Sequence, residues 1–405
     1  MHCLIIGKVW PEPTSTAAGR RTLDILLSLQ AAGWKLSYAS SAQAGPHSLD
    51  MAVMGISIHT IQLNDSGFDI WLSKLAPDVV IFDRFMIEEQ FGWRVEKVCP
   101  AALRVLDTVD LHCLRDARHH QLKTGAPLDL FNEMALREIA SIHRSDLTLK
   151  ISEFETQLLK DVFSIADQQL AYWPFVLNPA VRESLSFETR QHFIMIGSFQ
   201  HAPNLDAARW CQQVIWPLIR KALPTAELHL YGSYGDKYAG ELNAPKAGFH
   251  FKGRAEDALE TMQQYRVNLA PLRFGAGLKG KLFDGFETGT PGVTTPVGAE
   301  GISSAECAWG CVVSDAPEVI AETATQLYQD AMLWNHVQDC GQRIVEQRFS
   351  RGYWFDRLPR ILAGARDRLE VNRKANFVGS LLRHHHHRST EFMSRWIEAK
   401  NKDVS

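Results

Sequence analysis

The chain has 405 residues, of which 45% are hydrophobic and 22% charged, with a formal net charge of −3. This length suits two domains of ordinary size, each long enough to bury its own core. The small negative net charge gives no overall positive field that would attract nucleic acid. No stretch approaches the roughly 20 apolar residues that span a bilayer.

The N-terminus, Met1–Trp10, holds one short apolar run that predicts a buried strand. It lacks the basic region and small-residue cleavage site of a signal peptide. The seven cysteines are scattered and form no Cys-x-x-Cys motif, so we expect free thiols in a reducing compartment. These features predict a soluble, cytoplasmic protein.

Apolar runs alternate with longer amphipathic patterns through the first half, which is typical of βαβ units and parallel sheets. The predicted strands are Leu4–Gly7, Lys35–Ser40, Val79–Asp83, Leu103–Asp107 and Leu147–Ser152. A helix is predicted over Arg20–Gly33, with Gly33 as its C-terminal stop. Residues 1–172 are therefore predicted to form one Rossmann-like domain.

The second half repeats this pattern. Its predicted strands are His192–Ser198, Glu227–Gly232, Phe249–Gly253, Val267–Pro271, Gly292–Thr295 and Gly310–Ser314. Residues 173–190 hold two prolines and little periodicity, so they are predicted to link the domains. Residues 191–350 would then form a second Rossmann-like domain, and the predicted fold class is α/β with two doubly wound parallel sheets.

The sheet pattern stops near residue 350. Residues 351–370 predict an amphipathic helix with a kink at Pro359. The basic tail, residues 371–405, carries seven Lys or Arg against three acids. It also carries the apolar residues Phe377, Phe392, Met393 and Trp396. The tail either binds an anionic membrane surface or is a disordered, solvated segment. The run His384–His387 is either a transition-metal ligand set or a solvated stretch.

A glycine-rich, cationic loop is predicted between a strand that ends at Pro271 and a helix that begins near Leu282. Its glycines and cations are Arg273, Gly275, Gly277, Lys279, Gly280 and Lys281. Glycine lets a backbone approach a ligand closely, and helix N-terminal amides beside cations favour phosphate. In an open α/β sheet such a loop lies at the carboxyl end of a strand, where ligands bind. The bland alternative is a flexible loop with solvated lysines.

This segment resembles the donor-binding motif of retaining GT-B glycosyltransferases, the "group 1" family. The matching residues are Pro271–Arg273, Gly275, Gly277, Lys279, Asp284, Gly289–Pro291 and Gly298–Gly301. The segment Ile196–Trp210 is similar to the family's Gly-Ser/Asn-Phe-x-His/Trp-x-Pro-Asn stretch. The resemblance covers most of residues 190–350, whereas the first half matches only in layout.

The resemblance implies a GT-B fold, in which an N-terminal acceptor domain faces a C-terminal donor domain across a cleft. It implies metal-independent, retaining transfer of a sugar from a nucleotide-diphosphate donor to a hydroxyl of a polysaccharide, glycolipid or other glycoconjugate. The donor-binding residues it implies are Gly19, Gly197, Arg254, Arg273, Gly277, Lys279, Lys281, Asp284 and Glu300.

The resemblance also assigns roles to these residues. Asp284 replaces the family's glutamate that binds the ribose hydroxyls, since either carboxylate accepts from a vicinal diol. The cations of the loop would neutralise the diphosphate, Gly19 would face it from the N-terminal domain, and Arg254 would border the nucleobase. The family's first paired glutamate falls on Ala276 here, so Glu300 is a candidate substitute, with a plain turn carboxylate as the alternative.

The segment Val105–Arg118 follows a strand and gathers acidic and basic residues at its carboxyl end. By resemblance, His112 is the first candidate for positioning the acceptor or the leaving group, and Asp110 is the second. A structural loop histidine is the alternative. Ser152 is predicted to cap the next helix. No Asp-x-Asp motif occurs, so no metal or cofactor is expected in the transfer reaction, and cations and helix dipoles take that role.

Two rival functions remain open. A GT-B-shaped nucleotide-sugar epimerase would share the donor cleft, and a non-catalytic nucleotide-sugar-binding or assembly subunit would bind donor without turnover. A redox Rossmann enzyme is disfavoured because no Gly-x-Gly-x-x-Gly follows the first strand. The expected partners are a nucleotide sugar and a glycan or lipid-linked acceptor, with peripheral contact at the inner membrane face through the basic tail.

Overall fold

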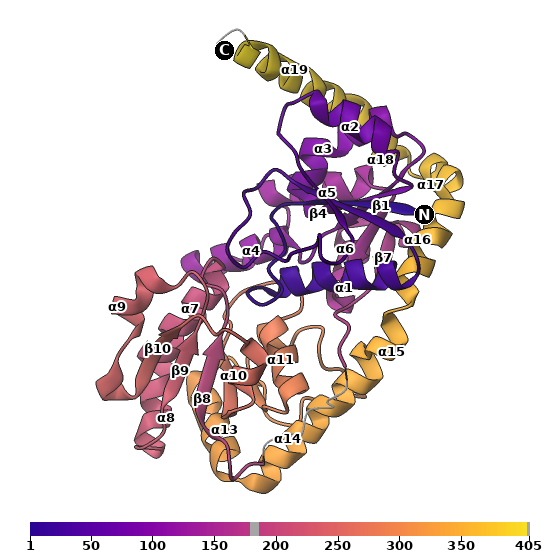
Figure 1. The fold of residues 1–405 in the computed structure, drawn as a ribbon. Helices are drawn as coiled ribbons and strands as arrows, with labels where there is room; N and C mark the ends of the chain where they lie inside the picture. The colour runs from indigo at the N-terminus through magenta and orange to yellow at the C-terminus, as the bar shows by residue number, and fades with distance from the viewer. Residues whose placement is uncertain (179–185, 403–405) are drawn as a thin grey trace.

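The structure, a computed structural model, describes residues 1–178 and 186–402. It has two parallel sheets in two domains that meet along one side (Figure 1). The N-terminal sheet has the order β3-β2-β1-β4-β5-β6-β7, and the C-terminal sheet has the order β10-β9-β8-β11-β12. In both sheets the strand order reverses beside the first strand, as in a doubly wound fold. The predicted fold class is therefore confirmed.

The N-terminal domain alternates strands and helices along the chain. Its strands are β1 (His2–Gly7), β2 (Lys35–Ser40), β3 (Ser57–Thr60), β4 (Val79–Asp83), β5 (Leu103–Asp107), β6 (Leu147–Lys150) and β7 (Leu170–Tyr172). Its helices are α1 (Ala17–Ala31), α2 (Gly67–Leu75), α3 (Phe85–Val98), α4 (His112–Thr124), α5 (Glu133–Arg144) and α6 (Glu153–Phe163). Strands β1, β2, β4, β5 and β6 form because their apolar runs are buried on both faces of the sheet, one under α1 and the other under α3 and α5.

The C-terminal domain repeats the pattern, and several of its helices are short. Its strands are β8 (Gln191–Ile196), β9 (Leu228–Tyr231), β10 (Phe249–Gly253), β11 (Tyr265–Ala270) and β12 (Gly292–Thr294). Its helices are α7 (Ala202–Trp210), α8 (Trp216–Ala222), α9 (Ala239–Leu242), α10 (Ala258–Met262), α11 (Gly280–Thr288), α12 (Pro296–Ala299), α13 (Pro317–Gln329) and α14 (Ala331–Ile344). A π-helical turn, Cys211–Ile215, joins α7 to α8.

The strand predicted over Gly310–Ser314 is wrong. This segment is irregular, and Gly310 has a φ of 91°, which an extended strand does not allow. A side chain at Gly310 would collide with Cys340 of α14, because its Cβ would lie 2.9 Å from that residue's Sγ. The segment therefore packs closely against α14 and does not form a further strand of the sheet.

The chain returns to the N-terminal domain after residue 350, along one side of the molecule (Figure 1). The returning helices are α15 (Arg351–Trp354), α16 (Arg357–Asp367), α17 (Leu369–Ala375), α18 (Phe377–Leu382) and α19 (Arg388–Lys402). Leu358 and Leu362 are fully buried in the N-terminal core. The break in the predicted helix falls before Arg357, so Pro359 lies in the first turn of α16, where proline is tolerated and no kink is needed.

The expectation of a disordered tail is wrong for residues 371–402. Arg373 donates to both carboxylate oxygens of Asp146, and Ser394 accepts from Arg94, so the tail is fixed to the N-terminal domain. The histidine run forms a π-helical turn, in which His387 is buried beside Glu88 and Glu96. Residues 403–405 of the predicted tail, and residues 179–185 of the predicted linker, lie outside the described residues.

Within the described part of the chain, none of the helices combines the length and apolarity that crossing a bilayer demands.

Candidate functional site

The glycine-rich loop lies between the two domains. It follows β11 and leads into α11, and most of its residues are buried. The amide of Gly277 donates to Oε1 of Glu155 in α6, at 2.6 Å. Nη1 of Arg118 in α4 donates to the carbonyl of Gly275, at 2.8 Å. The loop is thus held from the N-terminal domain, and the predicted placement at the interdomain cleft agrees with these contacts.

Gly277 has no room for a side chain. Its φ is 65°, in the left-handed region that favours glycine. A Cβ there would lie 2.8 Å from Cβ of Asp110, across the domain boundary. The predicted donor loop and the predicted catalytic segment therefore touch, as a cleft between donor and acceptor domains requires.

Two lysines, Lys279 buried and Lys281 half-buried, flank the beginning of α11. Nζ of Lys279 lies against the carbonyls of Ala276 and Gly277, at 3.2 and 2.5 Å. Nζ of Lys281 donates to Oδ1 of Asn204, at 2.8 Å. Burial lowers the pKa of each lysine to about 8, so both are mostly charged at neutral pH.

The N-terminus of α11 packs beside α1, since a Cβ at Gly280 would lie 2.6 Å from Cβ of Ala17. Lys279 is its N-cap residue, and no side chain caps the helix. Gly197, at the end of β8, borders the same region, since a Cβ there would lie 2.9 Å from Nζ of Lys281. Uncapped amides, a helix dipole and two ammonium groups together make a favourable place for a diphosphate.

Asp284 lies on the first turns of α11 and faces α1. Its Oδ1 accepts from Nη1 of Arg20 at 3.1 Å, and Arg20 also pairs with Glu287 at 2.7 Å. Burial raises the pKa of Asp284 to about 6, although Arg20 opposes the shift. The carboxylate predicted to hold the ribose is thus present at the domain boundary, with a guanidinium on it in this structure.

The loop between β1 and α1 meets the carboxyl ends of β9 and β10. Nη2 of Arg254 donates to Oγ1 of Thr14 at 3.0 Å, and the hydroxyl of Tyr234 donates to Oε2 of Glu12 at 3.0 Å. Gly19, in the first turn of α1, packs directly on the backbone of Glu12. Gly19 and Arg254 therefore border the same boundary, and their contacts with phosphate and nucleobase stay predictions.

Glu300 forms a bidentate ion pair across the boundary. Its carboxylate accepts from Nη1 and Nη2 of Arg118 at 3.0 and 2.6 Å, and both side chains are largely buried. Arg118 is therefore shared between Glu300 and the carbonyl of Gly275. This geometry places Glu300 beside the loop, where its role toward the donor sugar stays a prediction.

Arg273 points toward α7. Its guanidinium pairs with Asp206 and lies over the ring of Trp210, 5.4 Å from the centroid. About a third of the side chain is exposed. In this structure Arg273 is engaged by α7, so a contact with diphosphate would require the guanidinium to turn away from Asp206.

Asp110 and His112 follow β5 at its carboxyl end. Asp110 pairs with Arg115, and its Oδ1 lies 3.5 Å from Nε2 of His112. Burial lowers the pKa of His112 to about 3, and Arg115 holds the pKa of Asp110 at about 2 against the effect of burial. At neutral pH the pair is therefore a carboxylate beside a neutral imidazole.

The backbone near this pair is strained. Val109 has a φ of 62° and Arg84, after β4, has a φ of 72°. A positive φ is a genuine outlier for a β-branched residue such as valine, and such outliers persist where the surroundings over-determine them. The strain lies at the carboxyl ends of two adjacent strands, where the predicted site is.

A buried ion pair supports the loop from below. Nζ of Lys150 lies 2.9 Å from Oε2 of Glu155, and neither side chain is exposed. Oε1 of Glu155 accepts from the amides of Leu111 and Gly277, at 3.0 and 2.6 Å. Glu155 therefore joins the segment that holds Asp110 to the glycine loop of the other domain.

The sequence prediction missed Arg20, Arg118 and Glu155. Glu155 stands three residues after Ser152, which does cap α6 as predicted. That Ser-x-x-Glu spacing is the pattern of a capping box, in which the glutamate turns back to its own helix. Here the glutamate reaches Gly277 instead, and nothing local in the sequence indicates that choice.

Comparison with known proteins gives the same architecture. Residues 190–330 match the family model described as "Glycosyl transferases group 1". A glycosyltransferase from Rickettsia africae superposes with a TM-score of 0.65 and 11% identity, covering 90% of this chain and 98% of that one. Sucrose-phosphate synthase from Thermosynechococcus elongatus superposes with a TM-score of 0.65 and 13% identity, covering 90% of this chain and 99% of that one. HepE of Anabaena, in complex with UDP and glucose, superposes with a TM-score of 0.64 and 12% identity, covering 89% of this chain and 99% of that one.

No curated protein sequence matches the chain. The solved structures establish the GT-B fold. The family match confirms, over the C-terminal domain, the resemblance to group 1 glycosyl transferases that the loop motif predicted. Sugar transfer is the class of activity that the fold and the family match support together.

Proposed function

We propose that the protein is a metal-independent, retaining glycosyltransferase that moves a sugar from a nucleotide-diphosphate donor to a hydroxyl acceptor. One observation carries the proposal. The uncapped N-terminus of α11, the lysines Lys279 and Lys281, and Asp284 lie together at the boundary between the domains. This set has the chemistry to bind a diphosphate and a ribose at once.

The donor would lie along α11. Its diphosphate would accept from the first amides of α11 and from Lys279 and Lys281. Its ribose hydroxyls would donate to Asp284, displacing the guanidinium of Arg20 that pairs with it now. UDP is the first nucleotide to test, because HepE of Anabaena, which shares the fold, binds UDP and glucose.

Transfer breaks the bond between the anomeric carbon and the phosphate oxygen, and forms a bond from that carbon to the acceptor oxygen. The lysines and helix amides would stabilise the charge left on the phosphate. The pKa values of Asp110 and His112 lie far below 7, so neither group is tuned as a general base. We assign them to positioning the acceptor, whose proton passes to the departing phosphate on the same face of the sugar.

A product assay tests this proposal and its rivals. The protein is incubated with UDP-, GDP-, dTDP- and CMP-sugars, a panel of hydroxyl acceptors and EDTA. The proposal predicts a glycosylated acceptor with the donor's anomeric configuration, read by mass spectrometry and NMR. A changed nucleotide sugar formed without acceptor would identify an epimerase, and donor binding without turnover would identify a binding or assembly subunit.

Donor affinity is expected to be greatest between pH 6 and pH 8. Below pH 6 the carboxylate of Asp284 takes up a proton and becomes a weaker acceptor for the ribose hydroxyls. Above pH 8 Lys279 and Lys281 lose protons. The charged fraction of each falls about tenfold between pH 7 and pH 9, so binding that uses both charges should be roughly a hundredfold weaker at pH 9. Calorimetric titration with a UDP-sugar from pH 5 to pH 9.5 measures both limbs. The variant Asp284→Asn should lose only the fall in affinity below pH 6. A wild-type affinity that does not change from pH 7 to pH 9.5 contradicts the assignment of the lysines.

We also propose that α19 docks on an anionic lipid surface and brings the site to a lipid-linked acceptor. The polar side of α19 is bound to the N-terminal domain through Ser394 and Glu398. Its outer side exposes Phe392, Met393 and Trp396 by 65, 58 and 59%, around a shallow depression. Cationic residues border these apolar side chains on the same helix. They are Arg388, one turn before Phe392, and Lys400, one turn after Trp396, whereas Arg395 and Lys402 pair with Glu391 and Glu398.

Vesicle pelleting tests this surface. The full chain should sediment with vesicles that contain phosphatidylglycerol and remain in solution with neutral ones. The double variant Phe392→Ser/Trp396→Ser should reduce partitioning at least tenfold, since each buried aromatic contributes about 1.5–3 kcal/mol. The control Val53→Ser/Met332→Ser removes apolar side chains elsewhere that are even more exposed, and it should have no effect. Equal pelleting of both double variants contradicts the proposal.

A further inference from the structure

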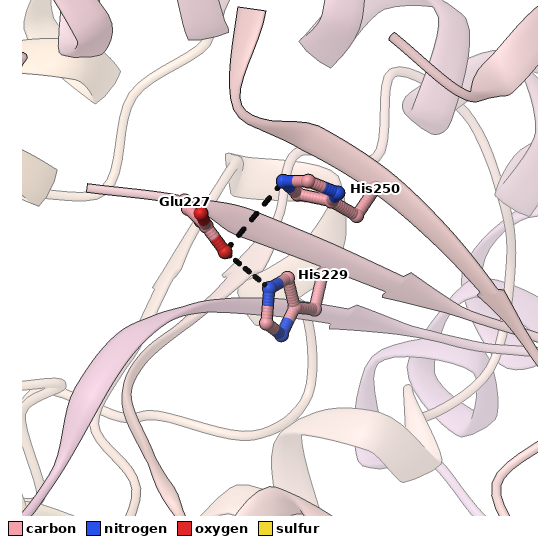
Figure 2. A group of neighbouring side chains, drawn as sticks. All are labelled: Glu227, His229 and His250. Carbon is pink, nitrogen blue, oxygen red and sulfur yellow. Dashed lines mark hydrogen bonds and ion pairs between the residues drawn. The ribbon is translucent and has the colours of Figure 1, made fainter. Parts of the chain in front are cut away.

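Three side chains of metal-ligating type converge in the amino-terminal part of the C-terminal sheet (Figure 2). Glu227 precedes β9, His229 lies in β9, and His250 lies directly opposite His229 in the neighbouring strand β10. All three are half-buried, and their ligand atoms lie within 4.8 Å of one another. In residues 1–178 and 186–402 such convergence occurs here, and not in the run His384–His387.

The distances between these atoms suit a single small ion. Oε2 of Glu227 lies 2.9 Å from Nε2 of His229 and 3.5 Å from Nε2 of His250. Ligand atoms about 2.0–2.1 Å from a tetrahedral zinc ion are about 3.3 Å apart, which falls between these two values. Nε2 of His250 is buried and makes no hydrogen bond within the described residues. Its contact with the carboxylate of Glu227, at 3.5 Å, is an ion-pair distance and not a hydrogen bond (Figure 2).

The ring of His229 is held from its other side. Its Nδ1 lies 2.7 Å from the hydroxyl of Tyr265 in β11, and that hydroxyl lies 2.9 Å from the hydroxyl of Tyr231. Metal-binding histidines commonly use the second ring nitrogen in this way, which fixes the ring and directs the first nitrogen at the ion. Tyr265 therefore supplies the outer support that such a site requires.

We propose that Glu227, His229 and His250 bind a divalent transition-metal ion, for which Zn²⁺ is the best match, with water completing a tetrahedral site. Two imidazoles and one carboxylate are a ligand set that zinc accepts. The ion would join β9 to β10, the edge strand of the sheet, and so stabilise the C-terminal domain. The donor loops follow the opposite, carboxyl ends of these strands, so this ion would stand outside the transfer reaction.

The test uses the full chain with His384→Ala/His385→Ala in every sample, because these two exposed histidines could bind metal on their own. Zn²⁺ is titrated by calorimetry, and thermal unfolding is followed with and without it. We expect one equivalent to bind and the melting temperature of the full chain to rise by roughly 3 °C at a hundredfold excess over Kd. X-ray absorption should show two nitrogen and one or two oxygen ligands at about 2.0–2.1 Å.

Single substitutions assign the ligands. Glu227→Gln and His250→Gln should abolish the thermal shift, and Tyr265→Phe should weaken binding about 10–100-fold while leaving one equivalent bound. His59→Gln, an exposed histidine of the other domain, is the matched control and should change nothing. Absence of zinc binding, or the same affinity in Glu227→Gln and in His59→Gln, would overturn the proposal.

Discussion

Replacing Lys279 with methionine is expected to lower kcat/KM for the donor by about 10²–10³-fold, as removal of one charge-stabilising donor does in other enzymes. The ammonium group is buried beside the uncapped start of α11, where removal of its charge from a site with little water is costly for a bound diphosphate. Methionine keeps the apolar stem and removes only the charge. Steady-state kinetics and the donor-induced thermal shift both measure the loss.

The control for this variant is Lys246→Met, which removes an exposed lysine of the same domain. It should leave kinetics and thermal shift unchanged. The melting temperature of the Lys279→Met protein without donor should stay near that of the wild type, which separates lost binding from lost folding. A wild-type donor shift in the Lys279→Met protein would refute the placement of the diphosphate.

Replacing Glu155 with alanine is expected to lower the free energy of unfolding by about 3–5 kcal/mol, because Lys150 would be left buried without its counter-charge. The midpoint of urea unfolding measures this loss. Donor affinity should fall as well, since the amide of Gly277 loses its acceptor.

The double variant Lys150→Met/Glu155→Leu separates the two effects. Replacing both charges with apolar groups should restore most of the stability, as it does for other buried ion pairs. It leaves the amides of Leu111 and Gly277 without the carboxylate, so donor affinity should stay low. Full recovery of donor affinity in the double variant would show that Glu155 does not hold the glycine loop.

The sequence predicted the sheets well where burial dictates a strand. Lys35–Ser40, Val79–Asp83 and Leu103–Asp107 agree with β2, β4 and β5, since their apolar runs are buried on both faces. Strand β3 was missed because all its residues are exposed and its sequence has no apolar run. Its pairing with β2, and not its own hydrophobicity, makes it a strand.

The tail was misjudged for a related reason. Its composition is basic and polar, which is typical of disorder. Its order comes from specific contacts with the N-terminal domain, such as Arg373 on Asp146 and Asn376 on the carbonyl of His143. Those partners stand more than 200 positions earlier, so local composition carries no sign of them.

In the candidate site, too, the residues that are close together in the chain were predicted and those contributed by the other domain were not. Glycines and lysines in one loop predicted an anion site, because the residues that form it are neighbours in the chain. Arg20, Arg118 and Glu155 come from the other domain and reach Asp284, Glu300 and Gly277 only through the docking of the two sheets. Their roles depend on how the domains meet, which no local pattern specifies.

A crystal structure of the protein with UDP tests the central claim most directly. We expect phosphate oxygens within hydrogen-bond distance of the first amides of α11 and of Lys279, and ribose hydroxyls on Asp284 in place of Arg20. UDP bound elsewhere, with the Arg20–Asp284 ion pair intact, would contradict it.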